Sequence, residues 1–152
     1  MIDCVTEYLD QVKQNRPEVE RLFINSDNGP ECSGQRTQWL NRLVQLSKDE
    51  NISIQLAYYP PYHSKYNPIE RFWGVLENHW CGEIISTVNK AIGLAKTMTY
   101  KSISPIVTLV NKVYEKGIKL TKKEMIDVER FIERKHGLEK YFFTINQATH
   151  LG

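Results

Sequence analysis

Hydrophobic and polar residues alternate in a pattern that predicts helix, strand, helix and strand along the first part of the chain. Apolar residues recur at helical spacing over residues 2–14, where Pro17 ends the pattern, and again over residues 34–48. Residues 22–24 form a short apolar run, and residues 52–58 alternate as in an edge strand with one wet face. Strands joined by a crossover helix are parallel, so this order favours an α/β fold.

The stretch over residues 58–80, YYPPYHSKYNPIERFWGVLENHW, predicts a shaped loop followed by a helix start. Asn67 is a strong N-cap residue and Pro68 suits the first helical position. Glu70 stands at the third position, where a carboxylate can reach back to the N–H of the cap. By spacing alone, Glu70 is explained more simply as a capping residue than as a catalytic one.

Beyond residue 82 the pattern is mainly helical. Segments near residues 85–100 and 104–115 have helical spacing, and a third helix begins at Thr121, where the sequence TKKE has the form of a capping box. Gly137 is expected to end that helix. The apolar residues 141–145 then form either a last short strand or a tail that packs on the body of the protein.

Two groups of residues are expected in the protein interior. Trp73 and Trp80 fall on the apolar stripe of the helix that starts at Pro68. The three cysteines, Cys4, Cys32 and Cys81, are widely spaced and contain no CxxC pair, so they indicate neither a disulfide framework nor a zinc site. We expect them to behave as small buried hydrophobic residues.

The composition is that of a soluble globular protein of one domain, with or without a helical appendage. The chain has 152 residues, of which 41% are hydrophobic and 25% are charged. No apolar run reaches the length of a membrane span, so no membrane partner is expected. The first residues lack the pattern of a signal peptide, which leads us to expect a cytoplasmic protein.

Charge is distributed unevenly along the chain. Residues 1–82 contain 8 Lys and Arg against 11 Asp and Glu, a net charge of −3, whereas residues 83–152 contain 12 against 7, a net charge of +5. The densest basic cluster consists of Lys112, Lys116, Lys119, Lys122 and Lys123. This cluster is either a solvated helix surface or a contact surface for an anionic partner such as the DNA backbone, which the charge asymmetry favours slightly.

Asp27 is a carboxylate at the end of the strand predicted at residues 22–24. It is followed by Asn28, Gly29 and Pro30, and Asp or Asn before Gly-Pro is a common turn former. Taken alone, Asp27 therefore needs no role beyond turn formation.

Asp27 and Glu70, taken with their surroundings, resemble the carboxylates of a known family. The sequence SDNGPE at residues 26–31, the NPIE segment within residues 58–80, and the downstream KTMT and KLTKK segments resemble bacterial insertion-sequence transposases of the DDE type. The resemblance extends over about residues 3–145. It implies the ribonuclease H-like fold that these enzymes share with retroviral integrases.

The resemblance implies a metal-dependent reaction on DNA. Members of the family cleave and join DNA strands with two Mg²⁺ ions, which activate the nucleophile and stabilise the leaving oxygen. Hard cations prefer carboxylate oxygens and water. Asp27 matches the second carboxylate of the family and Glu70 the third, so both are expected to be catalytic metal ligands.

The first carboxylate of the family has no match in this sequence. Asp3 and Asp10 fall on the first predicted helix and are not assigned to that role. The fold class expected is therefore α/β, an incomplete ribonuclease H-like core of helix-strand-helix-strand-helix with parallel strands over residues 1–82, its first three strands absent, followed by a mainly helical basic extension over residues 83–152. The strand at residues 22–24 would then have an open edge, completed by an upstream polypeptide or by self-association.

The same resemblance suggests residues that contact DNA, at transposon ends and at the target. His63, Lys65 and Arg71 lie near the expected metal site. Otherwise His63 is a hydrogen-bonded structural residue of the loop, and Lys65 and Arg71 are solvated charges without a function. Three residues of the basic cluster are expected to contact the DNA backbone, namely Lys119, Lys122 and Lys123. A homo-oligomer is expected by analogy. Tyr62 and Tyr66 could stack on a base or simply pack in the loop.

Two further functions remain open at this point. With two carboxylates of three, the chain is expected to be inactive by itself, so whether it is an enzyme stays uncertain. The alternative is a non-catalytic DNA-binding or interaction remnant of a decayed transposable element. A ribonuclease H-like nuclease acting on RNA hybrids has only the fold resemblance in its favour.

Overall fold

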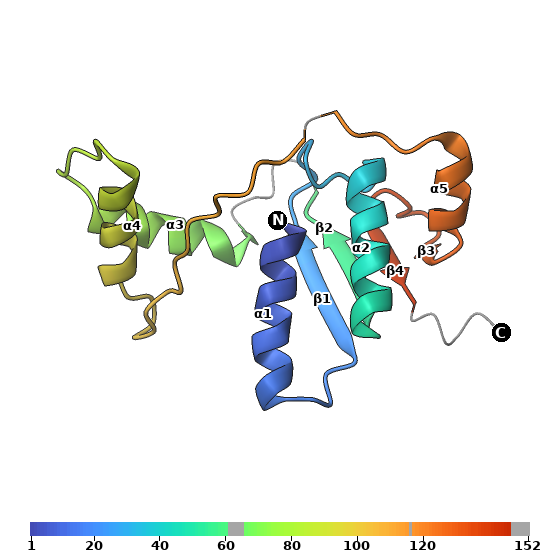
Figure 1. The fold of residues 1–152 in the computed structure, drawn as a ribbon, viewed down its shortest axis with the longest axis horizontal. Coiled ribbons are helices and arrows are strands. Elements are labelled where there is room, and N and C mark those ends of the chain that lie inside the picture. Colours follow the sequence, from blue (N-terminus) through green and yellow to red (C-terminus); the bar gives the residue numbers. More distant parts are fainter. Residues whose placement is uncertain (61–65, 116, 147–152) are drawn as a thin grey trace. The chain divides into compact units, whose positions relative to one another are not determined.

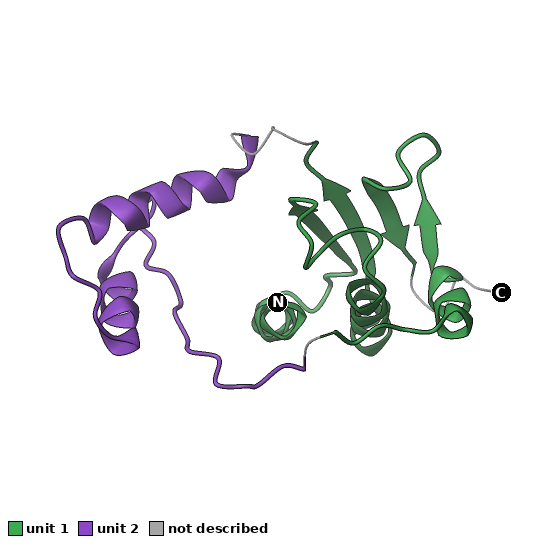
Figure 2. Ribbon diagram, turned by 90° about the horizontal axis from the view of Figure 1, so that it is seen from above, with its two compact units in different colours: residues 1–61, 117–152 green, residues 62–116 purple. Residues whose placement is uncertain are grey.

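A computed structural model describes residues 1–60, 66–115 and 117–146. The chain divides into two compact units, unit 1 (Met1–Pro61 with Gly117–Gly152) and unit 2 (Tyr62–Lys116), which Figure 2 colours green and purple. The described residues form five helices and four strands, labelled in Figure 1: α1 (Ile2–Asn15), β1 (Arg21–Ser26), α2 (Thr37–Glu50), β2 (Ser53–Tyr58), α3 (Pro68–His79), α4 (Val88–Thr97), α5 (Lys122–Glu129), β3 (Ile132–Arg134) and β4 (Phe142–Ile145).

The strands of unit 1 form a mixed sheet in the order β1-β2-β4-β3. β1 and β2 are parallel, with Leu22 opposite Ile54 and Ser26 opposite Tyr58. β4 runs antiparallel to both β2 and β3. The predicted α/β arrangement, with parallel strands joined by a crossover helix, is therefore confirmed.

The core of unit 1 lies between the sheet and the three helices α1, α2 and α5, which lie along one face of it (Figure 2). Alternate residues of β2 and β4 point into this core, and Leu56 and Phe143 are fully buried there. α2 contributes Leu40 and Leu43, which are equally buried. Burial of each such side chain contributes roughly 1.5–3 kcal/mol to folding.

The alternation of apolar and polar residues in β2 predicted an edge strand, and this prediction is wrong. β2 is an inner strand, because β4 pairs with its second edge. Its buried residues face the helices, and its intermediate residues lie on the opposite face of the sheet. The alternation therefore reports which face the helices cover, and it carries no information about the position of a strand within the sheet.

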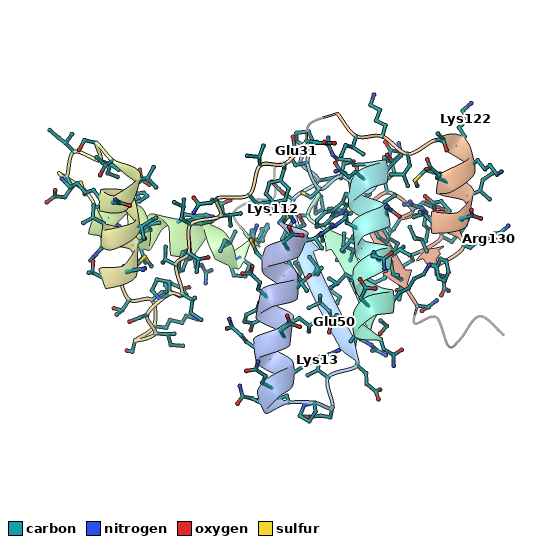
Figure 3. All side chains as sticks on the ribbon, in the orientation of Figure 1. Lys13, Glu31, Glu50, Lys112, Lys122 and Arg130 are labelled. Carbon is teal, nitrogen blue, oxygen red and sulfur yellow. The ribbon has the colours of Figure 1, made fainter. Side chains whose placement is uncertain are left out.

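Ion pairs attach α1 to α2 at both ends. Lys13 lies 3.0 Å from a carboxylate oxygen of Glu50, and Figure 3 shows the two side chains facing each other from α1 and α2. Asp3, at the other end of α1, pairs with Arg42. Asp3 therefore lies on a helix and pairs with a neighbouring helix, as expected for a residue without a metal-binding role.

The start of α3 agrees with the sequence, but the cap differs from the expected one. α3 begins at Pro68, and the side chain of Asn67 accepts a hydrogen bond from the N–H of Ile69 at 3.3 Å. The expected return bond from Glu70 to the cap does not occur among the described residues. Glu70 is exposed in the first turn of the helix, so Asn67 is the residue that caps α3.

The apolar stripe of α3 is only partly buried. Leu76 is buried, and the ring of Phe72 makes edge contacts with the rings of Trp73 and Tyr100. Trp73 is 52% exposed, so its assignment to the core was wrong. Trp80 is half-buried.

The C-terminal part of the chain is less helical than the sequence suggests. The segment expected to be helical near residues 85–100 is shortened to α4, and residues 104–115 form no helix. Pro105 and several β-branched residues in that segment disfavour a helix. α5 ends at Glu129, before the predicted end at Gly137. The chain then enters β3 and β4, so the extension supplies two strands to the sheet.

Gly34 lies where the loop after β1 packs closely against the sheet. A Cβ at Gly34 would lie 2.9 Å from the backbone oxygen of Lys140 and 3.2 Å and 3.3 Å from the rings of Tyr58 and Phe143. Gly34→Ala is therefore expected to destabilise unit 1 by about 1–3 kcal/mol. Gly74→Ala is the matched control, since nothing lies within 4 Å of that position, and it should stabilise α3 by about 0.5–1 kcal/mol. Urea unfolding measures both, and a midpoint for Gly34→Ala at or above that of the wild type would contradict the close packing.

Candidate metal and nucleic-acid site

Asp27 lies at the carboxyl end of a strand in unit 1. β1 ends at Ser26, and Asp27 follows it directly as an exposed residue, as the sequence predicts. The loop then turns back on itself, because the N–H of Cys32 donates to the carbonyl oxygen of Gly29 at 3.2 Å. This turn brings Cys32 back beside the end of the strand.

The thiol of Cys32 lies against Asp27. Its Sγ is 3.3 Å from the backbone oxygen of Asp27, 3.5 Å from Oδ1 of the Asp27 carboxylate and 3.3 Å from Oγ of Ser26. Burial raises the pKa of the Cys32 thiol, so it remains a hydrogen-bond donor at neutral pH. Cys32 is buried as expected, whereas Cys4 and Cys81 are exposed, which corrects their assignment to the interior.

Tyr58 connects the same loop to the core. Its hydroxyl donates to the carbonyl oxygen of Cys32 at 2.6 Å and accepts from Nε1 of Trp39 at 3.0 Å. Burial raises the pKa of Tyr58 to about 12, so the hydroxyl stays protonated. The last residue of β2 and a residue of α2 thus fix the loop that follows β1.

Arg134 attaches the loop to the C-terminal hairpin. Its guanidinium donates two hydrogen bonds to the carboxylate of Glu129, at 3.1 Å and 2.8 Å. It also donates to the backbone oxygens of Gly34 and Glu139, at 3.2 Å and 2.9 Å. Such forked geometry makes Arg134 a rigid connector between α5, the hairpin and the loop.

Glu70 belongs to unit 2, whereas Asp27 belongs to unit 1. Glu70 is exposed in the first turn of α3, beside the equally exposed Arg71. Both carboxylates are thus accessible to solvent and to a ligand. Among the described residues, no three His, Cys, Asp or Glu side chains are grouped so as to hold a metal ion.

The residues predicted to contact DNA divide into two sets. His63 and Lys65 lie outside the described residues, as do Tyr62 and Lys116. Lys119, Lys122 and Lys123 are exposed, and they lie just before and within the first turn of α5. Figure 3 shows Lys122 pointing away from the body of unit 1.

α5 begins with the predicted capping box. The hydroxyl of Thr121 accepts from the N–H of Glu124, and the Glu124 carboxylate accepts from the N–H of Thr121 at 2.7 Å. This bond, with a second from the Thr121 hydroxyl, lowers the pKa of Glu124. Lys122 and Lys123 occupy the first two helical positions, where the positive end of the helix dipole disfavours cations.

The sequence contained no signal for the contacts around Cys32. Cys32 and Tyr58 are 26 positions apart, and Arg134 is 100 positions from Gly34. Each of these bonds depends on the pairing of distant strands, which local patterns do not specify.

The chain matches the family of the Rhodopirellula transposase DDE domain over residues 1–147 and therefore belongs to that family. No curated protein and no solved structure matched significantly. Within the part that the structure describes, no helix has the length and apolar character needed to span a membrane.

The capping box predicts a pH-dependent contribution to stability. Because folding lowers the pKa of Glu124 below its ordinary value of 4.5, its contribution is present above about pH 4.5 and is lost as the pH falls through the folded pKa. Glu124→Gln should lower the urea midpoint at pH 7, and this difference from the wild type should shrink at pH 3.

Glu7→Gln, at an exposed position on α1, is the matched control and should leave the urea midpoint nearly unchanged at pH 7 and at pH 3. A Glu124→Gln deficit that is as large at pH 3 as at pH 7 would show that the ionised carboxylate does not stabilise α5.

Proposed function

We propose that this chain takes part in metal-dependent cleavage and transfer of DNA strands, with Asp27 and Glu70 as ligands of Mg²⁺. The observation that supports this most directly is the match to a DDE transposase family over residues 1–147, a range that contains both carboxylates. Asp27 follows a parallel strand, and Glu70 lies in the first turn of the helix after the next strand. Parallel strands direct their carboxyl ends to one edge of a sheet, where ligands commonly bind.

The chemistry of the two residues fits Mg²⁺. This ion usually keeps several waters and is bound through one or two carboxylates together with phosphate oxygens of the substrate. Asp27 and Glu70 are both exposed carboxylates, so water and phosphate can complete the shell. When bound, Mg²⁺ activates the attacking oxygen and stabilises the leaving oxygen.

We propose further that β1 pairs with an additional strand in the active form. Among the described strands, β1 pairs only with β2, and its second edge is open. Phe23 is half-exposed on this strand, and an open edge with apolar residues favours pairing with another segment. A segment that adds here would complete a ribonuclease H-like sheet and bring the missing first carboxylate, either from an upstream polypeptide or from a second copy.

The basic surface formed by Lys119, Lys122 and Lys123 is proposed to contact the DNA backbone. Two of its lysines stand where the dipole of α5 disfavours them, so they do not serve the stability of the helix. Local rules of stability are commonly broken at functional sites. Arg71, exposed beside Glu70, is proposed to contact phosphate near the metal ions.

A DNA-joining assay tests the proposed reaction. The chain by itself should not join a DNA 3′-end to a target duplex in Mg²⁺. Co-expression with a polypeptide that carries the first three strands of a family member should restore joining, and Asp27→Asn or Glu70→Gln should abolish it.

If the chain alone joins DNA ends and Asp27→Asn abolishes this activity, the missing first carboxylate is not needed, which would contradict the proposal. If the complex with the added polypeptide also fails to join DNA ends, the result would favour the alternative function, a non-catalytic DNA-binding remnant. The missing strands would then not be the reason for the inactivity.

A salt titration tests the basic surface separately. Replacing Lys119, Lys122 and Lys123 by Ala should reduce the slope of log Kobs against log salt by about 2.7, if each lysine neutralises one phosphate. The same triple variant should keep or slightly raise its urea midpoint, since two cations leave the start of a helix. The control replaces three exposed lysines elsewhere, Lys96, Lys135 and Lys140. Equal slopes for the two triple variants would contradict the assignment.

A further inference from the structure

We propose that Cys32 is a positioning residue for the Asp27 carboxylate, and that Tyr58 holds Cys32 in place. This inference rests on the proposed role of Asp27 as a metal ligand. It adds two residues that the family match and the sequence pattern leave without a role.

The first contact is between Cys32 and Asp27. The thiol lies 3.5 Å from Oδ1 and 3.3 Å from the backbone oxygen of Asp27, so one sulfur contacts both the side chain and the main chain of that residue. Ser26 also contributes, since its Oγ donates to the same backbone oxygen at 2.9 Å and lies 3.3 Å from the Cys32 sulfur. Within the described residues, Oδ2 of Asp27 accepts no hydrogen bond, which leaves this oxygen for a cation.

The second link joins Cys32 to the core. The Tyr58 hydroxyl accepts from Trp39 and donates to the carbonyl oxygen of Cys32, and all three residues are buried, at 6%, 6% and 3% exposure. A buried hydroxyl with both a donor and an acceptor has one orientation, so it fixes the backbone of Cys32. The exposed carboxylate of Asp27 is thereby connected through two residues to α2 and β2.

This arrangement has the form of an outer-shell contact to a metal ligand. Groups that hydrogen-bond to a ligating side chain orient it. Their removal commonly weakens metal binding by about 10- to 100-fold. Packing alone would explain a buried Cys32, but it would not require the thiol to lie beside the carboxylate of an otherwise exposed residue. The rotamer of Asp27 distinguishes the two explanations.

The experiment uses the full chain, five variants that test the positioning role, and Asp27→Asn to test the metal role. Cys32→Ala removes the donor, Cys32→Ser keeps a donor, and Tyr58→Phe removes only the hydroxyl. Cys81→Ala and Tyr8→Phe are matched controls, at an exposed cysteine and an exposed tyrosine outside these contacts. Three-bond NMR couplings to Cγ of Asp27 report whether its side chain holds one rotamer, and water-proton relaxation of Mn²⁺ reports the affinity for a divalent ion.

The wild type, Cys32→Ser and both controls should show a single Asp27 rotamer. Cys32→Ala and Tyr58→Phe should show averaged couplings and a Kd for Mn²⁺ raised about tenfold or more. A single rotamer in all variants would overturn the inference, as would an unchanged Kd in Cys32→Ala when the rotamer is lost. The proposed function has its own control: if Asp27→Asn leaves Mn²⁺ binding unchanged, the metal role of Asp27 fails, while the couplings still decide whether Cys32 positions the carboxylate.

Discussion

The parallel pairing of β1 with β2 is the constraint on which the candidate site depends. It places Ser26 opposite Tyr58, so the two strands end side by side. Asp27 and the loop that holds it therefore follow β1 at the same edge where β2 leads toward α3. Without this register, the Tyr58 hydroxyl could not reach the carbonyl oxygen of Cys32, and the loop after β1 would lose its attachment to the core.

The two proposed metal ligands have different local surroundings. The loop after β1 is attached to α2 through Tyr58 and Trp39, and to the C-terminal hairpin through Arg134. Glu70, by contrast, lies in a short first turn whose cap comes from Asn67, and its own carboxylate is left exposed. Of the two proposed ligands, Asp27 therefore has the more preorganised carboxylate, since the Cys32 thiol contacts it.

Local chemistry was predictable from the sequence, and long-range pairing was not. The strand end at Asp27, the start of α3 at Pro68 and the capping box at Thr121 all follow from short motifs, because each depends on neighbouring residues. The pairing of β4 with β2 and the exposure of Trp73 depend on residues far apart in the chain. The helical period of residues 104–115 was misleading for a different, local reason, since Pro105 and β-branched residues within the segment disfavour a helix.

The measurement that tests the proposed binding of Mg²⁺ by Asp27 and Glu70 most directly is paramagnetic broadening of backbone amide signals by substoichiometric Mn²⁺. If Asp27 and Glu70 bind one ion site, signals next to both residues, such as those of Gly29 and Arg71, should broaden together. Either Asp27→Asn or Glu70→Gln alone should then remove both effects. Broadening that each variant removes only at its own position would contradict a shared site, because it would mean that the two carboxylates bind the ion independently.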